Sequence, residues 1–463
     1  MREDNKEDKL KIASSFRDSS GFLFLSESNL YRQVNFLYKE HYDHLMNSGL
    51  FSLLEEKNLL IPHKEIKHGE VYSLGAYKIV QPDIIPFISY PYEWCFSQLK
   101  DAALTTLQIQ KHALEFGMIL KDASAYNIQF LNGKPILIDT LSFEVYKEGL
   151  PWIAYKQFCQ HFLAPLALMS YCNVHLGKLM QIYIDGIPLD LASSLLPYRL
   201  IFKISLYAHI HLQAKMQRIL KKQTRDLRTY HLSKKGLIAL IDNLESIVLS
   251  LNWKAKNTEW ADYYEETNYS SEAFKDKREI IKSFISKIAP AKLWDMGANN
   301  GVFSRIASGM GIETVGFDID PAAVEKNYIE MKKNQERNIL PLILDVTNPS
   351  PAIGWANEER YSLKERGPAD AIFALAMIHH LVITNNIPFS HIAEFFNKIS
   401  SYLIIEFIPK EDSQVQKMLV SSIKIFPDYT LKEFELVFKK YFSILDVKPI
   451  KDSKRILYLM KRR

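Results

Sequence analysis

The run from Lys292 to Asp320, KLWDMGANNGVFSRIASGMGIETVGFDID, constrains the fold more than any other part of the chain. It reads as a strand, a turn flanked by Gly297 and Gly301, a helix, and a second strand that ends at Asp318. Glycine leaves room for a ligand where a Cβ would block it, and the N-terminus of a helix offers unpaired N–H groups. An acid after the second strand is placed to accept hydrogen bonds from ribose hydroxyls. The run therefore predicts an α/β unit with a nucleotide-type pocket.

The spacing of the glycines separates two kinds of nucleotide pocket. Asn299 stands where the dinucleotide fingerprint G-x-G-x-x-G has its middle glycine, and no third glycine follows, so a pyrophosphate is a poor fit. The pattern of Asp295, Gly297 and Gly301 instead resembles motif I of the class I S-adenosylmethionine (SAM)-dependent methyltransferases, D/E-x-G-x-x-x-G. The resemblance covers roughly residues 262–463.

The chain downstream of this run follows the element order of that family. We expect strands over 340–344, 369–376 and 403–407, helices from Pro321 to about Met331 and over 430–441, and two terminal strands over 443–447 and 455–459. The resemblance implies an α/β fold with a Rossmann-like seven-stranded sheet, in which the last strand of a terminal antiparallel hairpin inserts beside the fifth.

The resemblance also implies SAM as the cofactor and assigns roles to its site. Glycines of the turn line the methionine part, Asp295 orients it, Asp318 binds the ribose, and Asp345 with Val346 faces the adenine. Asn268 and Tyr269 either close over the cofactor or pack against the first helix of the domain. The expected cofactor-binding residues are Asp295, Gly297, Ala298, Asn299, Gly301, Asp318, Ile319, Asp345, Val346, Asn268 and Tyr269.

The end of the fourth strand bears on the methyl acceptor. Residues 376–380, Ala-Met-Ile-His-His, lack the Asn/Asp-Pro-Pro-aromatic motif of enzymes that methylate amino groups in nucleic acids. All three cysteines precede residue 173, which disfavours cysteine-dependent methylation of pyrimidine C5. We expect O- or N-methylation of a small molecule or saccharide-type metabolite, with His379, His380 or Glu406 as acid or base and no metal. The histidines equally fit a structural role, and an RNA or protein acceptor is the alternative.

Three segments carry a narrower resemblance. Residues 294–305, 348–360 and 403–415 are similar to bacterial methyltransferases related to a host-specific nodulation protein. This resemblance implies a bacterial enzyme that acts on a cell-surface saccharide, a lipid-linked compound or a secondary metabolite.

The N-terminal half contains a second constellation of polar residues. Asp122 and Asn127 stand five residues apart, and an Asn132-Gly133 turn between apolar runs predicts a hairpin that brings Asp139 back beside them. This resembles the catalytic loop and the metal-binding acid of protein-kinase-like and aminoglycoside-phosphotransferase-like folds. The supporting helix is expected over 97–116.

Several departures weaken the kinase-like interpretation. Lys121 replaces the usual Arg, Leu120 replaces the usual His, and Asp139 lacks the Phe-Gly that normally follows. Lys78 is a candidate for the phosphate-anchoring lysine, but no glycine-rich loop precedes it. Three alternatives stay open: a kinase-like or bifunctional phosphotransferase, a kinase-derived fold without that activity, and a tight loop in which Asp, Ser and Asn cluster by chance.

Length and composition fit two domains. The 463 residues, 47% of them hydrophobic, are enough for two hydrophobic cores. We expect a flexible N-terminus over 1–20, an α+β, largely helical kinase-like domain over 21–255 and a methyltransferase domain over 262–463. No apolar stretch reaches the ~18 residues of a membrane span, and the charged N-terminus does not resemble a signal peptide. The cysteines show no C-x-x-C spacing, so neither a zinc ribbon nor a disulfide framework is expected. We expect a cytoplasmic protein.

The charge distribution does not identify a macromolecular partner. The net charge is +5, and the cluster of basic residues over 215–235 is most simply the solvated face of a helix. A nucleic-acid partner stays open but is not indicated, and a small-molecule or saccharide acceptor is favoured. The sequence does not specify an oligomeric state.

Overall fold

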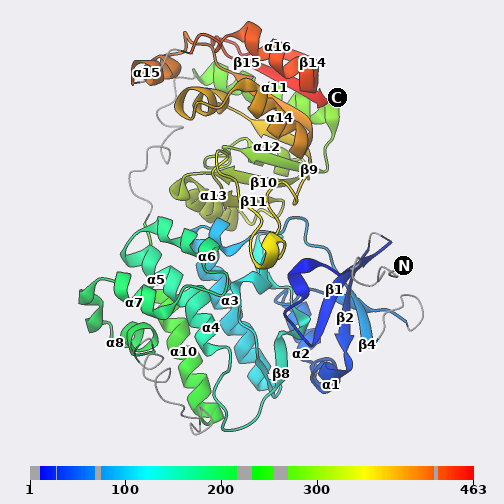
Figure 1. Ribbon diagram of the computed structural model, residues 1–463, viewed down its shortest axis with the longest axis vertical. Coiled ribbons are helices and arrows are strands. Elements are labelled where there is room, and N and C mark those ends of the chain that lie inside the picture. The colour runs from blue at the N-terminus through cyan, green and yellow to red at the C-terminus, as the bar shows by residue number, and fades with distance from the viewer. Residues whose placement is uncertain are drawn as a thin grey trace. The chain divides into compact units, whose positions relative to one another are not determined.

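A computed structural model of the chain (Figure 1) describes residues 11–27, 29–67, 75–213, 215, 232–254, 270–421 and 426–463. The chain divides into two compact units. The first comprises Met1–Lys254 together with Ala352–Arg360, and the second comprises Ala255–Pro351 and Tyr361–Arg463. Membership of Ala352–Arg360 in the first unit is a feature that the sequence did not suggest.

The first unit begins with a four-stranded antiparallel sheet in the order β1-β2-β4-β3. Helices α1 and α2 connect β2 to β3, and Val34, Tyr38, Tyr42, Val80 and Leu141 form a buried cluster against the sheet. The bounds are β1 (Gly21–Ser26), β2 (Asn29–Asn35), α1 (Lys39–Asn47), α2 (Leu50–Glu56), β3 (His63–Glu65) and β4 (Ala76–Pro82).

Residues 11–20, which we expected to be flexible, are packed against this sheet. Ala13–Ser15 form a 3-10 helix, and the backbone N–H of Ile12 donates to the carbonyl oxygen of Leu23 at 2.9 Å. Arg17 donates to both carboxylate oxygens of Glu359 at 2.8 and 2.9 Å, and only 2% of the Glu359 side chain is exposed. The prediction of a flexible segment is therefore wrong for this part, because local bonds to β1 and to the Ala352–Arg360 segment fix it.

The remainder of the first unit is built around the predicted helix α3 (Phe96–Glu115). Two short antiparallel strand pairs follow it, and in the predicted Asn132-Gly133 turn both residues have positive φ, 52° and 75°. The pairs are β5 (Met118–Leu120) with β8 (Phe143–Val145), and β6 (Ile128–Leu131) with β7 (Lys134–Leu137); the second pair is the predicted hairpin. The helices that follow are α4 (Tyr155–Phe158), α5 (Ala164–Tyr171), α6 (Leu179–Ile182), α7 (Leu189–Leu195), α8 (Ile204–Tyr207) and α10 (Lys234–Ser250).

The second unit is a seven-stranded sheet in the order β11-β10-β9-β12-β13-β15-β14. The first five strands of this order are parallel, and β15 pairs antiparallel with both β13 and β14. The strands are β9 (Lys292–Met296), β10 (Glu313–Asp318), β11 (Ile339–Ile343), β12 (Ala369–Ala374), β13 (Ser400–Phe407), β14 (Phe442–Pro449) and β15 (Ile456–Arg462). The expected α/β fold is confirmed.

Helices cover both faces of this sheet (Figure 1). Apolar side chains of α11, α12 and the strands form one core on one face, with Ile281, Phe284, Phe373 and Leu457 fully or almost fully buried. The helices are α11 (Ser271–Ile288), α12 (Ser304–Gly309), α13 (Pro321–Asn334), α14 (Phe389–Ile399), α15 (Ser413–Ser421) and α16 (Leu431–Tyr441). In the described part of the chain, no helix is both long and apolar enough to cross a membrane.

Candidate functional site

The turn after β9 is held to the end of β10 by backbone hydrogen bonds. The N–H groups of Gly297 and Ala298 both donate to the carbonyl oxygen of Phe317, at 2.8 and 2.9 Å. The turn needs left-handed backbone, because φ is 82° at Gly297 and Gly301 and 50° at Asn299. These bonds fix the carboxyl ends of the two strands at the same edge of the sheet.

The two glycines are required for different reasons. A Cβ at Gly301 would lie 2.6 Å from the side chain of Asn327 and 2.7 Å from that of Arg305, so this glycine permits α13 to pack behind the turn. A Cβ at Gly297 would lie 3.0 Å from the terminal methyl of Met377, on the side where a ligand would sit. Gly301 therefore maintains the packing, and Gly297 keeps space open for a ligand.

Two carboxylates lie beside the turn, and burial raises the pKa of each. The pKa of Asp295 is raised to about 7, although its Oδ2 accepts a hydrogen bond from Ser304 Oγ at 2.6 Å. The pKa of Asp318 is raised to about 6, although its two oxygens accept backbone N–H groups of Asn299 at 2.7 Å and Asp320 at 2.9 Å. In both cases desolvation outweighs the hydrogen bonds. A ligand that donates hydrogen bonds to these carboxylates would stabilise their charged forms.

A pocket of about 340 Å³ opens at this edge of the sheet. It is bordered by the ends of β9, β10, β11 and β12, which is where ligands bind in open parallel sheets. Its lining is Lys277, Asp295, Gly297, Ala298, Asn299, Phe303, Asp318, Ile319, Leu344, Asp345, Val346, Thr347, Leu375, Ala376, Met377, His380, Leu381, Thr384 and Asn385.

Most of the residues expected to bind the cofactor therefore lie together. Eight of them line the pocket: Asp295, Gly297, Ala298, Asn299, Asp318, Ile319, Asp345 and Val346. Gly301 is not part of the lining and acts through packing behind the turn. Asn268 and Tyr269 lie outside the described residues.

The two adjacent histidines differ in position. His380 lines the pocket, and burial lowers its pKa to about 4, so its imidazole is neutral near pH 7. His379 does not line the pocket, is 3% exposed, and has a pKa held well below the usual value, mainly by burial. The structure therefore argues against His379 as an acid or base and retains His380.

Glu406 is enclosed in a network of buried charges. Its Oε2 accepts from Lys277 Nζ at 2.7 Å and from the backbone N–H of Ala376 at 2.9 Å. Its Oε1 lies 3.8 Å from Arg455 Nη1, and the Glu406 side chain has no exposed surface. Glu406 does not line the pocket, and its oxygen atoms are engaged by Lys277 and by the backbone of Ala376. These contacts argue against Glu406 as an acid or base.

Lys277 is a pocket residue that the sequence interpretation missed. It lies on α11, its side chain is 2% exposed, and its ammonium sits 4.5 Å from the centre of the Phe303 ring. A signal was present, since Lys277 stands four residues after Ala273 and four before Ile281, both fully buried. This spacing places the lysine on the apolar face of the helix, where a charge needs a specific partner.

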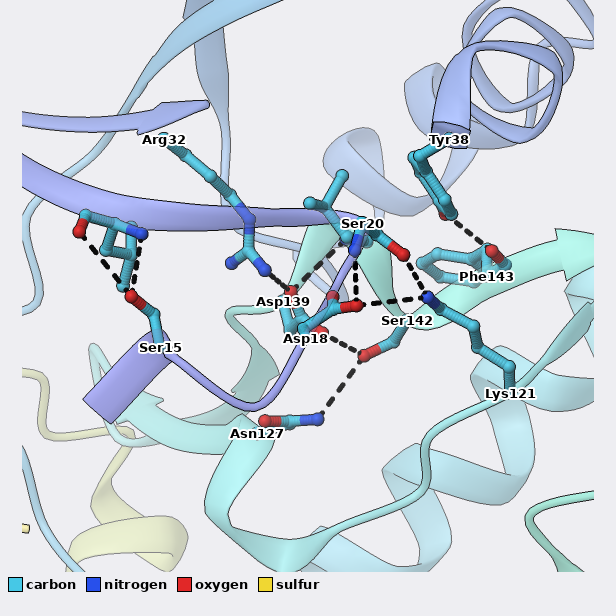
Figure 2. Close-up of polar contacts among 12 residues, drawn as sticks. Ser15, Asp18, Ser20, Arg32, Tyr38, Lys121, Asn127, Asp139, Ser142 and Phe143 are labelled. Atoms are coloured by element: carbon cyan, nitrogen blue, oxygen red, sulfur yellow. Dashed lines mark hydrogen bonds and ion pairs between the residues drawn. The ribbon is translucent and has the colours of Figure 1, made fainter. Parts of the chain in front are cut away.

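In the first unit, Asn127 and Asp139 both contact Ser142 (Figure 2), and Asp122 lies close enough to be affected by the charge of Asp139 and by a hydrogen bond from Asn127. Asn127 Nδ2 donates to Ser142 Oγ at 3.3 Å, and Ser142 Oγ donates to Asp139 Oδ2. The pKa of Asp122 is raised by burial and then by the charge of Asp139, and is partly restored by hydrogen bonds, one of them from Asn127. Ser142 is a linking residue that the sequence interpretation did not include.

The cation that faces Asp139 is Arg32 of β2 (Figure 2), not Lys78. Arg32 Nη2 forms an ion pair with Asp139 Oδ1, and the two side chains are 10% and 13% exposed. Lys78 on β4 instead pairs with Glu65 at 2.6 Å. The pair with Glu65, on the neighbouring strand, argues against Lys78 as a member of this site.

Within the described ranges, no group of three or more His, Cys, Asp or Glu residues is arranged to hold a metal ion. Most of the basic cluster over 215–235 lies outside those ranges, so the structure adds nothing to its interpretation.

The strand order, the glycine turn and the acid-lined pocket define the second unit as a class I SAM-dependent methyltransferase domain. No family model matches the chain. The chain is 33% identical to nodulation protein NoeA of Rhizobium meliloti (strain 1021) over 459 residues, which covers 98% of this chain and 96% of that protein. The chain belongs to the NoeA family.

Two solved structures are similar to part of the chain. Magnesium protoporphyrin IX methyltransferase (ChlM) from Synechocystis PCC 6803, with bound SAH, is 13% identical, covers 43% of this chain and 91% of its own, and has a TM-score of 0.32. N-methyltransferase NodS from Bradyrhizobium japonicum WM9 is 10% identical, covers 42% of this chain and 98% of its own, and has a TM-score of 0.31.

Proposed function

We propose that the protein transfers a methyl group from SAM to an oxygen or nitrogen of a small molecule or saccharide-type metabolite. The pocket at the carboxyl ends of β9 to β12 carries this proposal, because it combines the open side of Gly297 with two buried carboxylates. A dinucleotide is disfavoured, since the turn lacks the glycines that let a pyrophosphate approach the backbone.

The residues of the pocket suit the parts of SAM. Asp318 uses one lone pair of each oxygen for the backbone N–H groups of Asn299 and Asp320, which leaves the others for ribose hydroxyls. Asp345 and Val346 would face the adenine. The buried ammonium of Lys277 would pair with the carboxylate of the methionine part.

When bound, SAM would supply a methyl group on a sulfonium, which an in-line displacement transfers to the acceptor. The protein then has to position two reactants and receive a proton where the acceptor loses one. His380 is suited to the second task, since it lines the pocket and is neutral above about pH 5. Its low pKa makes it a weak base, so positioning would supply most of the rate enhancement.

For the first unit we propose a kinase-like accessory domain that helps to bind or present the acceptor, within a protein that acts in the cytoplasm. The clustering of Asp122, Asn127 and Asp139 supports the kinase-like interpretation. Phosphoryl transfer is the second candidate, and the ion pair between Arg32 and Asp139 opposes it in the observed arrangement, because Asp139 is not available to a metal.

Calorimetric titration of the full chain with SAM tests the cofactor. We expect SAM to bind to the wild type and to lose most of its affinity in Asp318→Ala. Asp370→Ala is a matched control, because this carboxylate caps the backbone N–H groups of Ala291 and Lys292 at the opposite end of the sheet. Failure of the folded wild type to bind SAM would refute the proposal.

The acceptor requires a separate experiment. SAM labelled in its methyl group is incubated with the protein and, in turn, with RNA, protein, lipid and small-metabolite extracts. We expect label in the small-metabolite or lipid-linked saccharide fraction, and none when Asp318→Ala replaces the wild type. Label found only in RNA or only in protein would overturn the acceptor class while leaving methyl transfer intact.

A further inference from the structure

Residues 195–204 carry two sets of large apolar side chains, one buried and one exposed. They run from the last residue of α7 through a 3-10 helix, Tyr198–Phe202, to the first residue of α8 (Figure 1). Leu196 and Leu200 are buried in the first unit and anchor the segment. Three other apolar side chains are turned to solvent, with Tyr198 87%, Phe202 85% and Ile204 78% exposed. A segment that is apolar on both sides is suited to a second apolar environment.

The charge of this part of the chain has one sign. Residues 191–225 contain seven lysines and arginines and no aspartate or glutamate, whereas the whole chain is almost balanced, with 58 basic and 53 acidic residues. Two of the seven, Arg199 and Lys203, stand among the exposed apolar residues, and both are themselves exposed. Lys203 Nζ donates to the hydroxyl of Tyr171 at 2.6 Å, which uses one of the three N–H donors of an ammonium. The segment therefore suits a surface that is both apolar and negatively charged.

The combination of side chains distinguishes between three kinds of partner. A nucleic acid would use the cations and could stack bases on the aromatic rings, but the aliphatic side chain of Ile204 offers it neither contact. A protein partner would cover the apolar residues, but it would not require a long stretch of chain without acids. An anionic lipid surface uses both features, because aromatic and aliphatic side chains enter the boundary between headgroups and acyl chains while lysine and arginine bind the phosphates.

We propose that residues 195–204 dock the first unit onto an anionic lipid surface. Tyr198, Phe202 and Ile204 enter the boundary between headgroups and acyl chains, and the two cations of the segment lie at the level of the lipid phosphates. Each cation held near such a surface contributes about fivefold to the affinity. The inference is independent of methyl transfer, because none of these residues lines the pocket of the second unit.

Co-sedimentation of the full chain with lipid vesicles tests the proposal. The probes are vesicles of phosphatidylcholine alone and vesicles of phosphatidylcholine mixed with phosphatidylglycerol. We expect the wild type to bind the anionic vesicles at least about tenfold more tightly than the neutral ones, and to lose most of this preference at high salt. Absence of binding to the anionic vesicles would overturn the proposal.

Two variants separate docking by this segment from general attraction between charges. Tyr198→Ser/Phe202→Ser/Ile204→Ser removes the exposed apolar groups without changing the net charge, and it should weaken binding to the anionic vesicles at least about tenfold. Arg199→Gln should weaken it by about fivefold. The substituted side chains are exposed, so both variants should fold, which circular dichroism and a SAM titration verify.

Phe36→Ser is the matched control. Phe36 is 64% exposed and also lies on a 3-10 helix of the first unit, but the sequence after it contains Glu40 and Asp43, so this variant should bind vesicles as the wild type does. A triple variant that binds like the wild type would overturn the proposal and leave only general attraction by the net positive charge. Self-association of the wild type in sedimentation velocity that is lost in the triple variant, with no vesicle binding by either, would also overturn it and would identify the segment as an interface between copies of the chain.

Discussion

The buried pair of Lys277 and Glu406 makes the sharpest prediction. Replacing Lys277 with Met retains the apolar stem of the side chain and removes the ammonium that lies 2.7 Å from Glu406 Oε2. The carboxylate then stays fully buried, with Arg455 at 3.8 Å and the backbone N–H of Ala376 as its remaining partners. The variant therefore leaves a buried charge that is only partly compensated.

The expected loss of stability follows from that burial. Removing one partner of a buried ion pair destabilises a protein by about 3–5 kcal/mol, and the remaining contact with Arg455 places the expectation near the lower end. In a unit of about 200 residues, each kcal/mol lowers Tm by about 2–4 °C, so a loss of about 3 kcal/mol should lower the unfolding temperature by roughly 6–12 °C. Lys287→Met is the control on the same helix, because its pair with Asp446 is half exposed and should contribute about 0–1 kcal/mol.

A double-mutant cycle followed by scanning calorimetry measures this effect. In Lys277→Met/Glu406→Gln no carboxylate is left without its cation, and Arg455 keeps Asp412 at 2.8 Å. The double variant should therefore recover about 1–3 kcal/mol relative to the sum of the single losses. SAM affinity should fall in Lys277→Met even below its unfolding temperature. Single losses under about 1 kcal/mol, or losses that simply add, would refute the account of the pair as a buried, coupled interaction.

Three further predictions concern the pocket. Gly301→Ala should destabilise the protein by about 1–3 kcal/mol in urea unfolding, because φ is 82° and a Cβ would lie 2.6 Å from a side chain of α13. Gly309→Ala is the control and should not destabilise the protein, because a Cβ at Gly309 would meet no atom within 4 Å. The pKa values of Asp295 and Asp318 are raised, so the folded state binds more protons than the unfolded state between about pH 4 and 7. Their contribution to stability therefore declines as pH rises, by up to about 1.4 kcal/mol per proton and pH unit. Urea unfolding across this pH range measures the decline. His380→Gln should lower the rate of methyl transfer without changing SAM affinity, and wild-type activity should show no titration of His380 above about pH 5, which a pH–rate profile measures.

The local parts of the pocket could be predicted from the sequence. The turn, its two glycines and the acid at Asp318 lie within one run of 29 residues, where strand, turn and helix signals follow one another directly. Steric limits at positive φ and the alternation of apolar residues act over a few residues, so one chain is enough to identify them. The Asn132-Gly133 hairpin in the first unit was predictable for the same reason.

The parts that could not be predicted depend on contacts between distant segments. Lys277 pairs with Glu406 across 129 positions, and Arg32 pairs with Asp139 across 107. Local patterns indicate that such a charge lies on a buried face, but they do not identify its partner, because that choice is made by packing. Lys78 shows the consequence, since it was the candidate phosphate-anchoring lysine and the sequence did not identify Glu65 as its partner.

The charges of the pocket also bear on how a product would leave it. Three carboxylates, Asp295, Asp318 and Asp345, line the pocket, and the ammonium of Lys277, which also lines it, would meet the methionine carboxylate that the methyl donor and its product share. A sulfonium ligand brings a positive charge into this environment, and the thioether left after methyl transfer does not. Attraction in a poorly solvated pocket is stronger than in water, so the acids favour the methyl donor over its product. Burial raises the pKa of Asp295 to about 7, although Ser304 and Lys277 act in the opposite direction, so a sulfonium charge nearby would further stabilise the ionised carboxylate. Loss of that charge would weaken binding at the step when the site must be vacated.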